Sequence, residues 1–287
     1  MKHFTRFLCL FFAAAMLLTM AACGSKTDDT TTDHTQGDAN AESVDLVVFA
    51  AASMTETLTE IAEMYKKYKR VISPMGCRAF LSPWYERGGM EPADENDKPV
   101  FVGRFNIGAV SLHLPMILAK SRSENRDFHE VLDFYLEMIR DLHKRTYDYL
   151  GEMRASTNPL AYCEGGFYGG HLKPSDKIRP LLKPMTASFG ITALNELQEL
   201  YNGKSLVEDG QFALDTLKYI NDKVAEFKKE DGILYAIYGT PAESLCGLQI
   251  EQFRKQYGIV RNVSDRPYVS NSFHCHVTED ITPIQKQ

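Results

Sequence analysis

The sequence predicts an α/β fold with parallel strands. Two apolar runs, 100–114 and 233–238, have the composition of buried strands. Apolar residues spaced three and four apart follow each run, as in amphipathic helices. Alternating strands and helices favour a parallel sheet, because each helix returns the chain to the start of the next strand. A chain with 44% hydrophobic and 24% charged residues is globular, which excludes wholesale disorder and a polytopic membrane protein.

The N-terminal residues predict targeting rather than fold. Two basic residues, Lys2 and Arg6, precede an apolar run over 7–18 that is too short to cross a bilayer. Ala21-Ala22-Cys23 resembles the lipobox of bacterial lipoproteins, which implies a signal peptide over 1–22 and a lipid anchor on Cys23. An ordinary signal peptide with an incidental cysteine stays open. The Thr- and Asp-rich residues 23–43 predict a disordered, flexible linker.

A strand and a helix are predicted over 44–70. Residues 44–51 are almost continuously apolar, and a helix opens after the small-residue turn at Ser53. The run Val-Val-Phe-Ala-Ala-Ala-Ser resembles the start of periplasmic molybdate-binding lipoproteins, which implies that Ser53 contacts an oxyanion. The alternative is that Ser53 only caps the helix.

Helices are the clearest predictions in the large segment, 71–287. The first begins at Ser123, has Asp127 near its cap, and carries an apolar stripe that predicts core positions: Phe128, Val131, Leu132, Tyr135, Met138, Ile139 and Leu142. Further helices are predicted over 192–201, 211–229 and 242–257. Gly232 and Gly258 follow the last two in C-cap positions.

Glycines mark two other places. Gly103 and Gly108, inside the predicted strand 100–114, indicate close approach of another backbone or a ligand, so this strand and the turn at Cys77 could line one site. The run Gly165–Gly170 lacks the Lys-Ser/Thr of a phosphate loop and predicts a backbone bend.

The remaining cysteines do not predict a metal site. Cys163, Cys246 and Cys275 have no CxxC spacing, so buried thiols are expected. In a strand, His274 and His276 would share one face and Cys275 would take the other, which is poor geometry for three ligands.

An ordered series of motifs resembles anaerobic (class III) ribonucleoside-triphosphate reductases. The matching segments are Ser-Pro-Met-Gly-Cys-Arg at 73–78, Gly-Arg-Phe-Asn-Ile-Gly at 103–108, Asn158-Pro159-Leu160 with Cys163-Glu164-Gly165-Gly166, Thr-Pro-Ala-Glu at 240–243 and Asn-Ser-Phe-His at 271–274. The resemblance runs from about residue 71 to the end of the sequence. It implies part of a glycyl-radical-enzyme α/β barrel that has ten strands when complete.

The resemblance also implies site residues. Cys77 matches the cysteine that becomes a thiyl radical, and Met75 and Asn106 match residues that line the ribose. A thiyl radical is required because no acid or base in a protein can draw a hydrogen atom from ribose C3′. Weaker candidates for phosphate or sugar contacts are Thr240, Asn271, Ser272 and His274.

By the same resemblance the substrate is a ribonucleoside triphosphate and the reductant is formate or a thiol. The family uses a glycyl radical made by an S-adenosylmethionine iron-sulfur activase, a structural zinc and ATP or dNTP effectors. The sequence has no CxxC pair and no counterpart of the radical-glycine segment or of the other half-barrel. We therefore expect this chain to carry no glycyl radical, to bind neither the zinc nor the effectors, and to be inactive alone.

The sequence gives two conflicting predictions of the cellular location. The leader implies a membrane-anchored protein outside the cytoplasm, whereas nucleotide reduction implies the cytoplasm. A joint near residues 68–71 between a binding lipoprotein and a reductase segment would explain both. The alternative function is an oxyanion-binding lipoprotein of a transporter. With 38 acidic against 32 basic residues, nucleic acid is not expected as a partner, and membrane contact is expected only through the lipid.

Overall fold

A computed structural model describes residues 66–67 and 81–282, all within the unit Ala50–Gln287. Three parallel strands form a sheet in the order β1-β2-β3, in which β2 pairs with both neighbours. The strands are β1 (Asn106–His113), β2 (Thr186–Thr192) and β3 (Leu234–Gly239). The predicted α/β class with parallel strands is confirmed.

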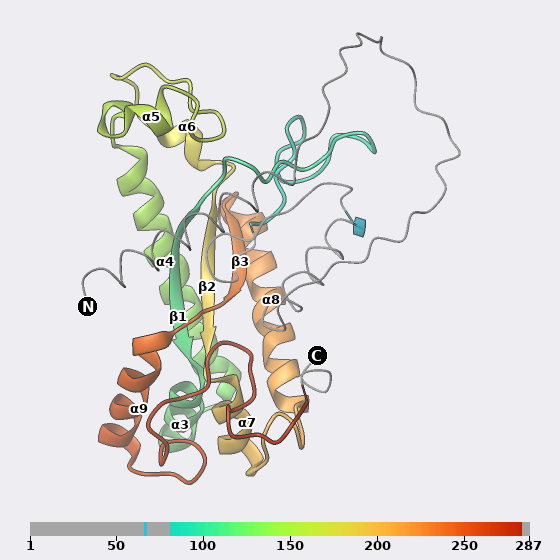
Figure 1. Ribbon diagram of the computed structural model, residues 1–287, viewed down its shortest axis with the longest axis vertical. Helices are drawn as coiled ribbons and strands as arrows, with labels where there is room; N and C mark the ends of the chain where they lie inside the picture. Colours follow the sequence, from blue (N-terminus) through green and yellow to red (C-terminus); the bar gives the residue numbers. More distant parts are fainter. Residues whose placement is uncertain (1–65, 68–80, 283–287) are drawn as a thin grey trace, which may run out of the picture. The chain divides into compact units, whose positions relative to one another are not determined.

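The helices are arranged around the two ends and one face of this sheet. They are α3 (Leu114–Glu124), α4 (Phe128–Gly151), α5 (Pro159–Tyr162), α6 (Arg179–Leu182), α7 (Leu194–Asn202), α8 (Gln211–Asp231) and α9 (Glu243–Tyr257), with a 3-10 turn η2 (Ala155–Thr157). Figure 1 shows α3, α7 and α9 gathered at the carboxyl ends of the strands, and α5 and α6 at the amino ends.

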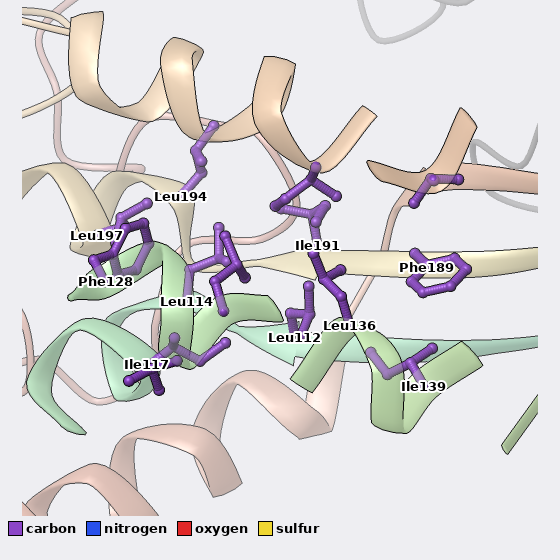
Figure 2. Close-up of a cluster of buried hydrophobic side chains, with 14 of the residues drawn as sticks. Leu112, Leu114, Ile117, Phe128, Leu136, Ile139, Phe189, Ile191, Leu194 and Leu197 are labelled. Carbon is purple, nitrogen blue, oxygen red and sulfur yellow. The ribbon is translucent and has the colours of Figure 1, made fainter. Parts of the chain in front are cut away.

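The main hydrophobic core lies between the sheet and the helices α4 and α8. Phe189 and Ile191 of β2 pack there with Leu112 of β1 and with Leu136 and Ile139 of α4 (Figure 2). These side chains are at most 6% exposed. Burying each one contributes about 1.5–3 kcal/mol, so this face of the sheet supplies much of the stability.

The predicted helix start at Ser123 is wrong. Ser123 lies in the last turn of α3, which ends where Asn125 takes the left-handed conformation at φ 52°. Helix α4 then begins after Asp127, whose carboxylate accepts hydrogen bonds from the backbone N–H groups of His129 and Glu130 at 2.8 and 3.1 Å. Asp127 is therefore the cap, and the sequence contains two helices where one was predicted.

The predicted apolar stripe of α4 is right over its first turns and wrong further along. Phe128, Val131, Leu132 and Ile139 are buried, but Met138 and Leu142 are 53% and 47% exposed. Leu136 and His143 take the core-facing positions instead. This is expected because the side of a straight helix that faces its neighbours rotates gradually along the helix.

The predicted strand 100–114 is too long at both ends. Residues 100–105 lie outside the sheet, and Leu114 already belongs to α3. Gly103 has φ 77°, and its carbonyl accepts a hydrogen bond of 2.8 Å from the N–H of Tyr168. A Cβ at Gly103 would lie 3.0 Å from that nitrogen. The predicted close approach of another backbone is thus confirmed at Gly103, and its partner is the predicted bend 165–170. It is not found at Gly108, where no described atom lies within 4 Å of a Cβ position.

Among the longer elements, α3 and β2 were not predicted, and neither were the short α5, α6 and η2. The sequence Leu-Pro-Met of α3 was included in the predicted strand, although proline suits the first turn of a helix. The β2 sequence Thr-Ala-Ser-Phe-Gly-Ile-Thr alternates small or polar residues with apolar ones, and its glycine weakens the strand signal. The predicted helices 192–201, 211–229 and 242–257 are found as α7, α8 and α9 with small boundary shifts.

Helix α7 is buried although most of its first residues are polar. Four of its side chains accept hydrogen bonds from three loops and from the first turn of α8: Asn195 from Leu206 N, Glu196 from Ser270 Oγ, Glu199 from Asn262 Nδ2 and Gln198 from Ala213 N of α8. These contacts fix the loops around the carboxyl ends of the strands, because each loop would otherwise leave a buried donor unsatisfied.

Several predictions fall outside the described residues. They are the signal peptide 1–22, the linker 23–43, the strand 44–51, and the site residues Cys23, Ser53, Met75 and Cys77. The described part of the chain contains no helix that is long and apolar enough to cross a membrane. The incomplete barrel stays a prediction, since the described sheet has three strands.

Candidate functional site

One face of the sheet is lined by small polar side chains instead of apolar ones. In β2 the residues Ala187, Phe189 and Ile191 belong to the helix-covered core. Because strand side chains alternate, Ser188 and Gly190 point to the opposite side. We call this side the polar face and define it as Asn106 and Ser111 of β1, Ser188 and Gly190 of β2, and Thr240 just after β3.

Asn106 begins β1 and its amide is held from two sides. Its Nδ2 donates a hydrogen bond to Ser188 Oγ, and its Oδ1 accepts one of 2.9 Å from the N–H of Gly108. The register of β1 against β2 shifts between Asn106 and Gly108, which turns the amide along the sheet toward Ser188. An Asn amide has two N–H groups, and the described residues engage one of them in Asn106, which leaves the other for a ligand.

Ser111 and Thr240 form the second pair on the polar face. Their hydroxyl oxygens are 2.7 Å apart, and the Thr240 N–H donates to the carbonyl of Ile191 at 3.1 Å. A Cβ at Gly190 would lie 2.3 Å from Thr240 Oγ1 and 2.5 Å from Ser111 Oγ. Glycine at position 190 is therefore what allows the two hydroxyls to meet over β2.

The turn 271–274 packs against the end of β3 and the start of α9. Asn271 Oδ1 accepts a hydrogen bond of 3.1 Å from the N–H of Ala242, the N-cap residue of α9, and so ties the turn to the start of the helix. Ser272 is 1% exposed, and its Oγ would lie 2.1 Å from a Cβ at Gly239. Three of the predicted residues, Thr240, Asn271 and Ser272, therefore meet around Gly239, whereas Asn106 lies toward the amino end of the sheet.

A cavity of about 770 Å³ opens at the N-terminus of α9. It is lined by Glu243 and Ser244 of the first turn, by Asn271 and His274 of the turn, and by Glu279. The first intrahelical donor of α9 is the N–H of Cys246, which bonds the carbonyl of Ala242. The N–H groups that precede it carry the positive end of the helix dipole. This end of the cavity can receive an anionic group.

A buried carboxyl group lies behind the wall of this cavity. Ser270 lines the cavity and donates a hydrogen bond of 2.9 Å to Glu196 Oε1, while Glu196 Oε2 has no hydrogen-bond partner among the described residues. Burial raises the pKa of Glu196 to about 7. Burial, together with the Glu196 charge, also raises the pKa of the Cys246 thiol. At neutral pH this carboxyl group can hold or release a proton.

The chain that follows the Cys77 segment is tied to the amino ends of two strands. Ser82 N donates to Thr186 Oγ1 at 3.1 Å, and Ser82 Oγ donates to the carbonyl of Tyr235 at 2.8 Å. Thr186 is the residue that pairs with Asn106 in the sheet register. The described chain that resumes at Leu81 therefore starts at the same end of the sheet as Asn106.

The expectation of three buried thiols is correct for one of them. Cys246 is buried, but Cys163 and Cys275 are half-buried. The residues around Cys275 form turns and not a strand, so the argument from strand faces does not apply to His274 and His276. Within the described ranges, no group of three or more His, Cys, Asp or Glu residues could hold a metal ion.

Comparison with known proteins identifies the family. The model of the anaerobic ribonucleoside-triphosphate reductase family matches residues 25–287. This chain belongs to that family. The family match begins at residue 25 and thus includes the segment 44–70. The predicted joint near 68–71 stays a prediction.

Relatives in the family are much longer than this chain. The anaerobic ribonucleoside-triphosphate reductase of Enterobacteria phage T4 is 32% identical over 221 residues, which are 75% of this chain and 34% of that protein. The Haemophilus influenzae enzyme is 30% identical over 220 residues, 75% of this chain and 30% of its own length. The chain thus spans about a third of these relatives. The Thermotoga maritima anaerobic ribonucleotide reductase aligns in structure over 60% of this chain and 29% of its own, with 17% identity and a TM-score of 0.44.

Three residues of the polar face were missed by the reasoning from sequence: Ser111 of β1, and Ser188 and Gly190 of β2. The last two could have been found. The signal that could have found them is the alternation in Thr-Ala-Ser-Phe-Gly-Ile-Thr, where each second residue is small or polar. A strand with one apolar side and one side of small polar residues indicates a core on one face and a different environment on the other.

Proposed function

We propose that this chain carries part of the ribonucleoside-triphosphate site of an anaerobic reductase. In this proposal Asn106 contacts the ribose, Thr240 and the first turn of α9 contact the phosphates, and Cys77 is the residue that becomes a thiyl radical. The observation that carries the proposal is the polar face itself, which runs from the Asn106 amide to the Thr240 hydroxyl, just before α9 begins.

The spacing on the polar face supports a nucleotide. Ser188, which holds Asn106, and Gly190, which lies under Thr240, are two residues apart in β2, or about 7 Å along the strand. This separation is of the order expected between a ribose hydroxyl and the phosphates on the same nucleotide. The free N–H of Asn106 can donate to a ribose oxygen, and the N–H groups of α9 can bind phosphate oxygens.

The chain geometry is also compatible with Cys77 near the ribose. Cys77 lies five residues before Ser82, and five residues of chain span at most about 18 Å. In the proposed first step, the Cys77 thiyl sulfur takes the hydrogen atom from ribose C3′, so an S–H bond forms, a C–H bond breaks and the radical moves to the sugar. Asn106 then holds the adjacent hydroxyls while the 2′ hydroxyl takes up a proton and leaves as water. A reductant supplies two electrons, formate leaving as carbon dioxide or a thiol pair as a disulfide, and a proton, so that hydrogen replaces the hydroxyl at C2′. Cys77 then returns its hydrogen atom to C3′ and is again a thiyl radical.

Calorimetric titration of the purified chain with cytidine triphosphate tests the proposal. We expect Asn106→Ala and Thr240→Ala each to weaken binding about fivefold, the effect of one lost hydrogen bond. Lys204→Ala, at an exposed position away from the polar face, is the matched control and should leave affinity unchanged. Absence of binding, or equal affinity in all four proteins, would refute the proposed site.

A charge variant sharpens the phosphate assignment. Glu279 lines the same cavity as the first turn of α9, and its carboxylate repels a bound phosphate. Glu279→Gln should therefore strengthen cytidine triphosphate binding by up to a few-fold and leave binding of uncharged cytidine unchanged. A weaker affinity for the triphosphate in this variant would place the phosphates elsewhere.

Turnover is proposed to require parts that this sequence does not match. We expect no deoxyribonucleotide from the chain alone in an anaerobic assay with formate or dithiothreitol and a radical activase. The lipid anchor at Cys23, the location outside the cytoplasm and the oxyanion contact of Ser53 remain predictions. Titration with molybdate separates the alternative: micromolar binding that Ser53→Ala abolishes would favour an oxyanion-binding protein.

A further inference from the structure

We infer that Ser188 is a positioning residue that fixes the orientation of the Asn106 amide on the polar face. Its hydroxyl accepts one N–H of Asn106, so that the other N–H is presented to a ligand as a donor. The inference rests on the proposed function for the identity of the ligand, a ribose oxygen. The contact between the two side chains stands independently of it.

The hydrogen bonds of the Asn106 amide allow one orientation. The N–H of Gly108 needs an acceptor, and Asn106 Oδ1 provides it at 2.9 Å. A flipped amide would place NH₂ against that N–H, which is repulsive because both groups are donors. The Nδ2 atom must therefore lie on the side of Ser188, where the hydroxyl oxygen accepts from it.

Ser188 is well placed to act as the fixed partner. It lies in the central strand, is 1% exposed, and its neighbours in β2 pair with both β1 and β3. Its backbone carbonyl is 3.1 Å from Nε2 of His143, a buried residue of α4. Since a carbonyl only accepts, Nε2 carries the proton in this contact. Ser188 is thus held by the sheet and by a helix on the other side of it.

Asn106 itself is held less firmly by the sheet. It is the first residue of β1, and the register shifts between it and Gly108. At such an irregularity the backbone ladder does not define the side-chain direction as it does in mid-strand. The side-chain contacts to Ser188 and Gly108 therefore decide where the amide points, which is the usual arrangement of a site residue supported by a rigid neighbour.

The direct test is proton exchange of the Asn106 side-chain amide in the full chain. Selective ¹⁵N-asparagine labelling gives one pair of amide signals per asparagine, and the pair that Asn106→Ala removes belongs to Asn106. We expect Ser188→Ala to speed exchange of the Asn106 amide protons at least tenfold and to weaken cytidine triphosphate binding about fivefold. Ser188→Thr keeps the hydroxyl and should restore both.

Ser121→Ala provides the matched control. This serine is also buried, but its hydroxyl bonds the carbonyl of Leu118 within α3, so neither the Asn106 signals nor nucleotide affinity should change. Urea unfolding of each variant separates an oriented amide from a general loss of structure. An unchanged Asn106 exchange rate in Ser188→Ala would overturn the inference.

Two further outcomes test the positioning role of Ser188 and separate it from the proposed function. Faster Asn106 exchange in Ser188→Ala with unchanged nucleotide affinity would show a structural contact only and would overturn the positioning role. If the unmodified chain binds no cytidine triphosphate, the proposed function fails, whereas faster exchange in Ser188→Ala would still establish that Ser188 orients the amide.

Discussion

The two faces of β2 differ in what their side chains contribute. On one face Phe189 and Ile191 pack among the residues of α4 and α8, and on the other Ser188 and Gly190 adjoin Asn106, Ser111 and Thr240. Burial of large apolar groups contributes several times more free energy than a neutral hydrogen bond. The comparison teaches that stability and the candidate site are supplied by alternate residues of the same strand.

The largest effect is expected on the apolar face. Phe189 is fully buried against Phe227, Tyr235 and His143. Phe189→Ala should lower the free energy of unfolding by about 4 kcal/mol, because it removes apolar contacts and leaves a cavity. Urea denaturation measures this change, and Phe134→Ala, at a position 52% exposed on α4, should cost less than about 0.5 kcal/mol. Similar losses for both variants would contradict the assignment of the core.

The next prediction concerns the pH dependence of folding stability. It tests whether the carboxyl group of Glu196 is buried near the cavity without a strong partner. The folded pKa of Glu196, about 7, is above its ordinary value of 4.5. Its carboxyl group therefore favours the folded state when protonated, and about 3 kcal/mol of this stability is lost as pH rises from 4.5 through 7.

Glu196→Gln should remove this pH dependence, so the stability difference between the two proteins should change across this interval. The comparison between them is needed because burial lowers the pKa of His113 to about 4, which makes stability fall as pH decreases below 6.5. A constant difference between the two proteins from pH 4.5 to 8 would show that Glu196 does not titrate in this range.

A larger side chain at position 190 tests how closely the polar face is packed. Gly190→Ala would place a methyl group 2.3 Å from Thr240 Oγ1 and 3.0 Å from the Ser111 backbone. We expect a loss of about 2 kcal/mol in thermal or urea unfolding, since backbone and side chains must move apart. Gly203→Ala is unsuitable as a control because of its positive φ, but Gly247→Ala, with open space around its Cβ, should be tolerated. Equal stability of the two variants would argue against the close packing of the polar face.

The smallest effect is expected for a single hydroxyl. Ser111→Ala removes the hydrogen bond to Thr240 and should cost about 1 kcal/mol, far less than the Phe189 variant. Differential scanning calorimetry resolves such a change. A loss as large as that of Phe189→Ala would mean that the polar face contributes to the core, and the contrast between the faces would have to be abandoned.

Sequence periodicity was enough to predict α4, α7, α8, α9 and the parallel sheet, because long apolar repeats and C-terminal glycines act locally. It was not enough for β2 or for the break between α3 and α4. The break depends on Asn125 in a left-handed conformation and on the cap at Asp127, which are decided by one or two residues. The predicted site residues Asn106 and Thr240 were placed by family motifs, whereas Ser188 and Gly190 become visible only when the register of β1 against β2 is known.

The two hydrogen bonds of Ser82 have a further consequence for Cys77. The next backbone contact between described residues along the chain is at Trp84, whose carbonyl bonds the N–H of Val100 at 2.7 Å. The Ser82 contacts are therefore the hydrogen bonds between described residues that lie nearest to Cys77 along the chain. Under the proposed role of Cys77, a fixed point five residues away in the sequence would keep the effective concentration of its sulfur high near this end of the sheet, because effective concentration falls as tether length grows.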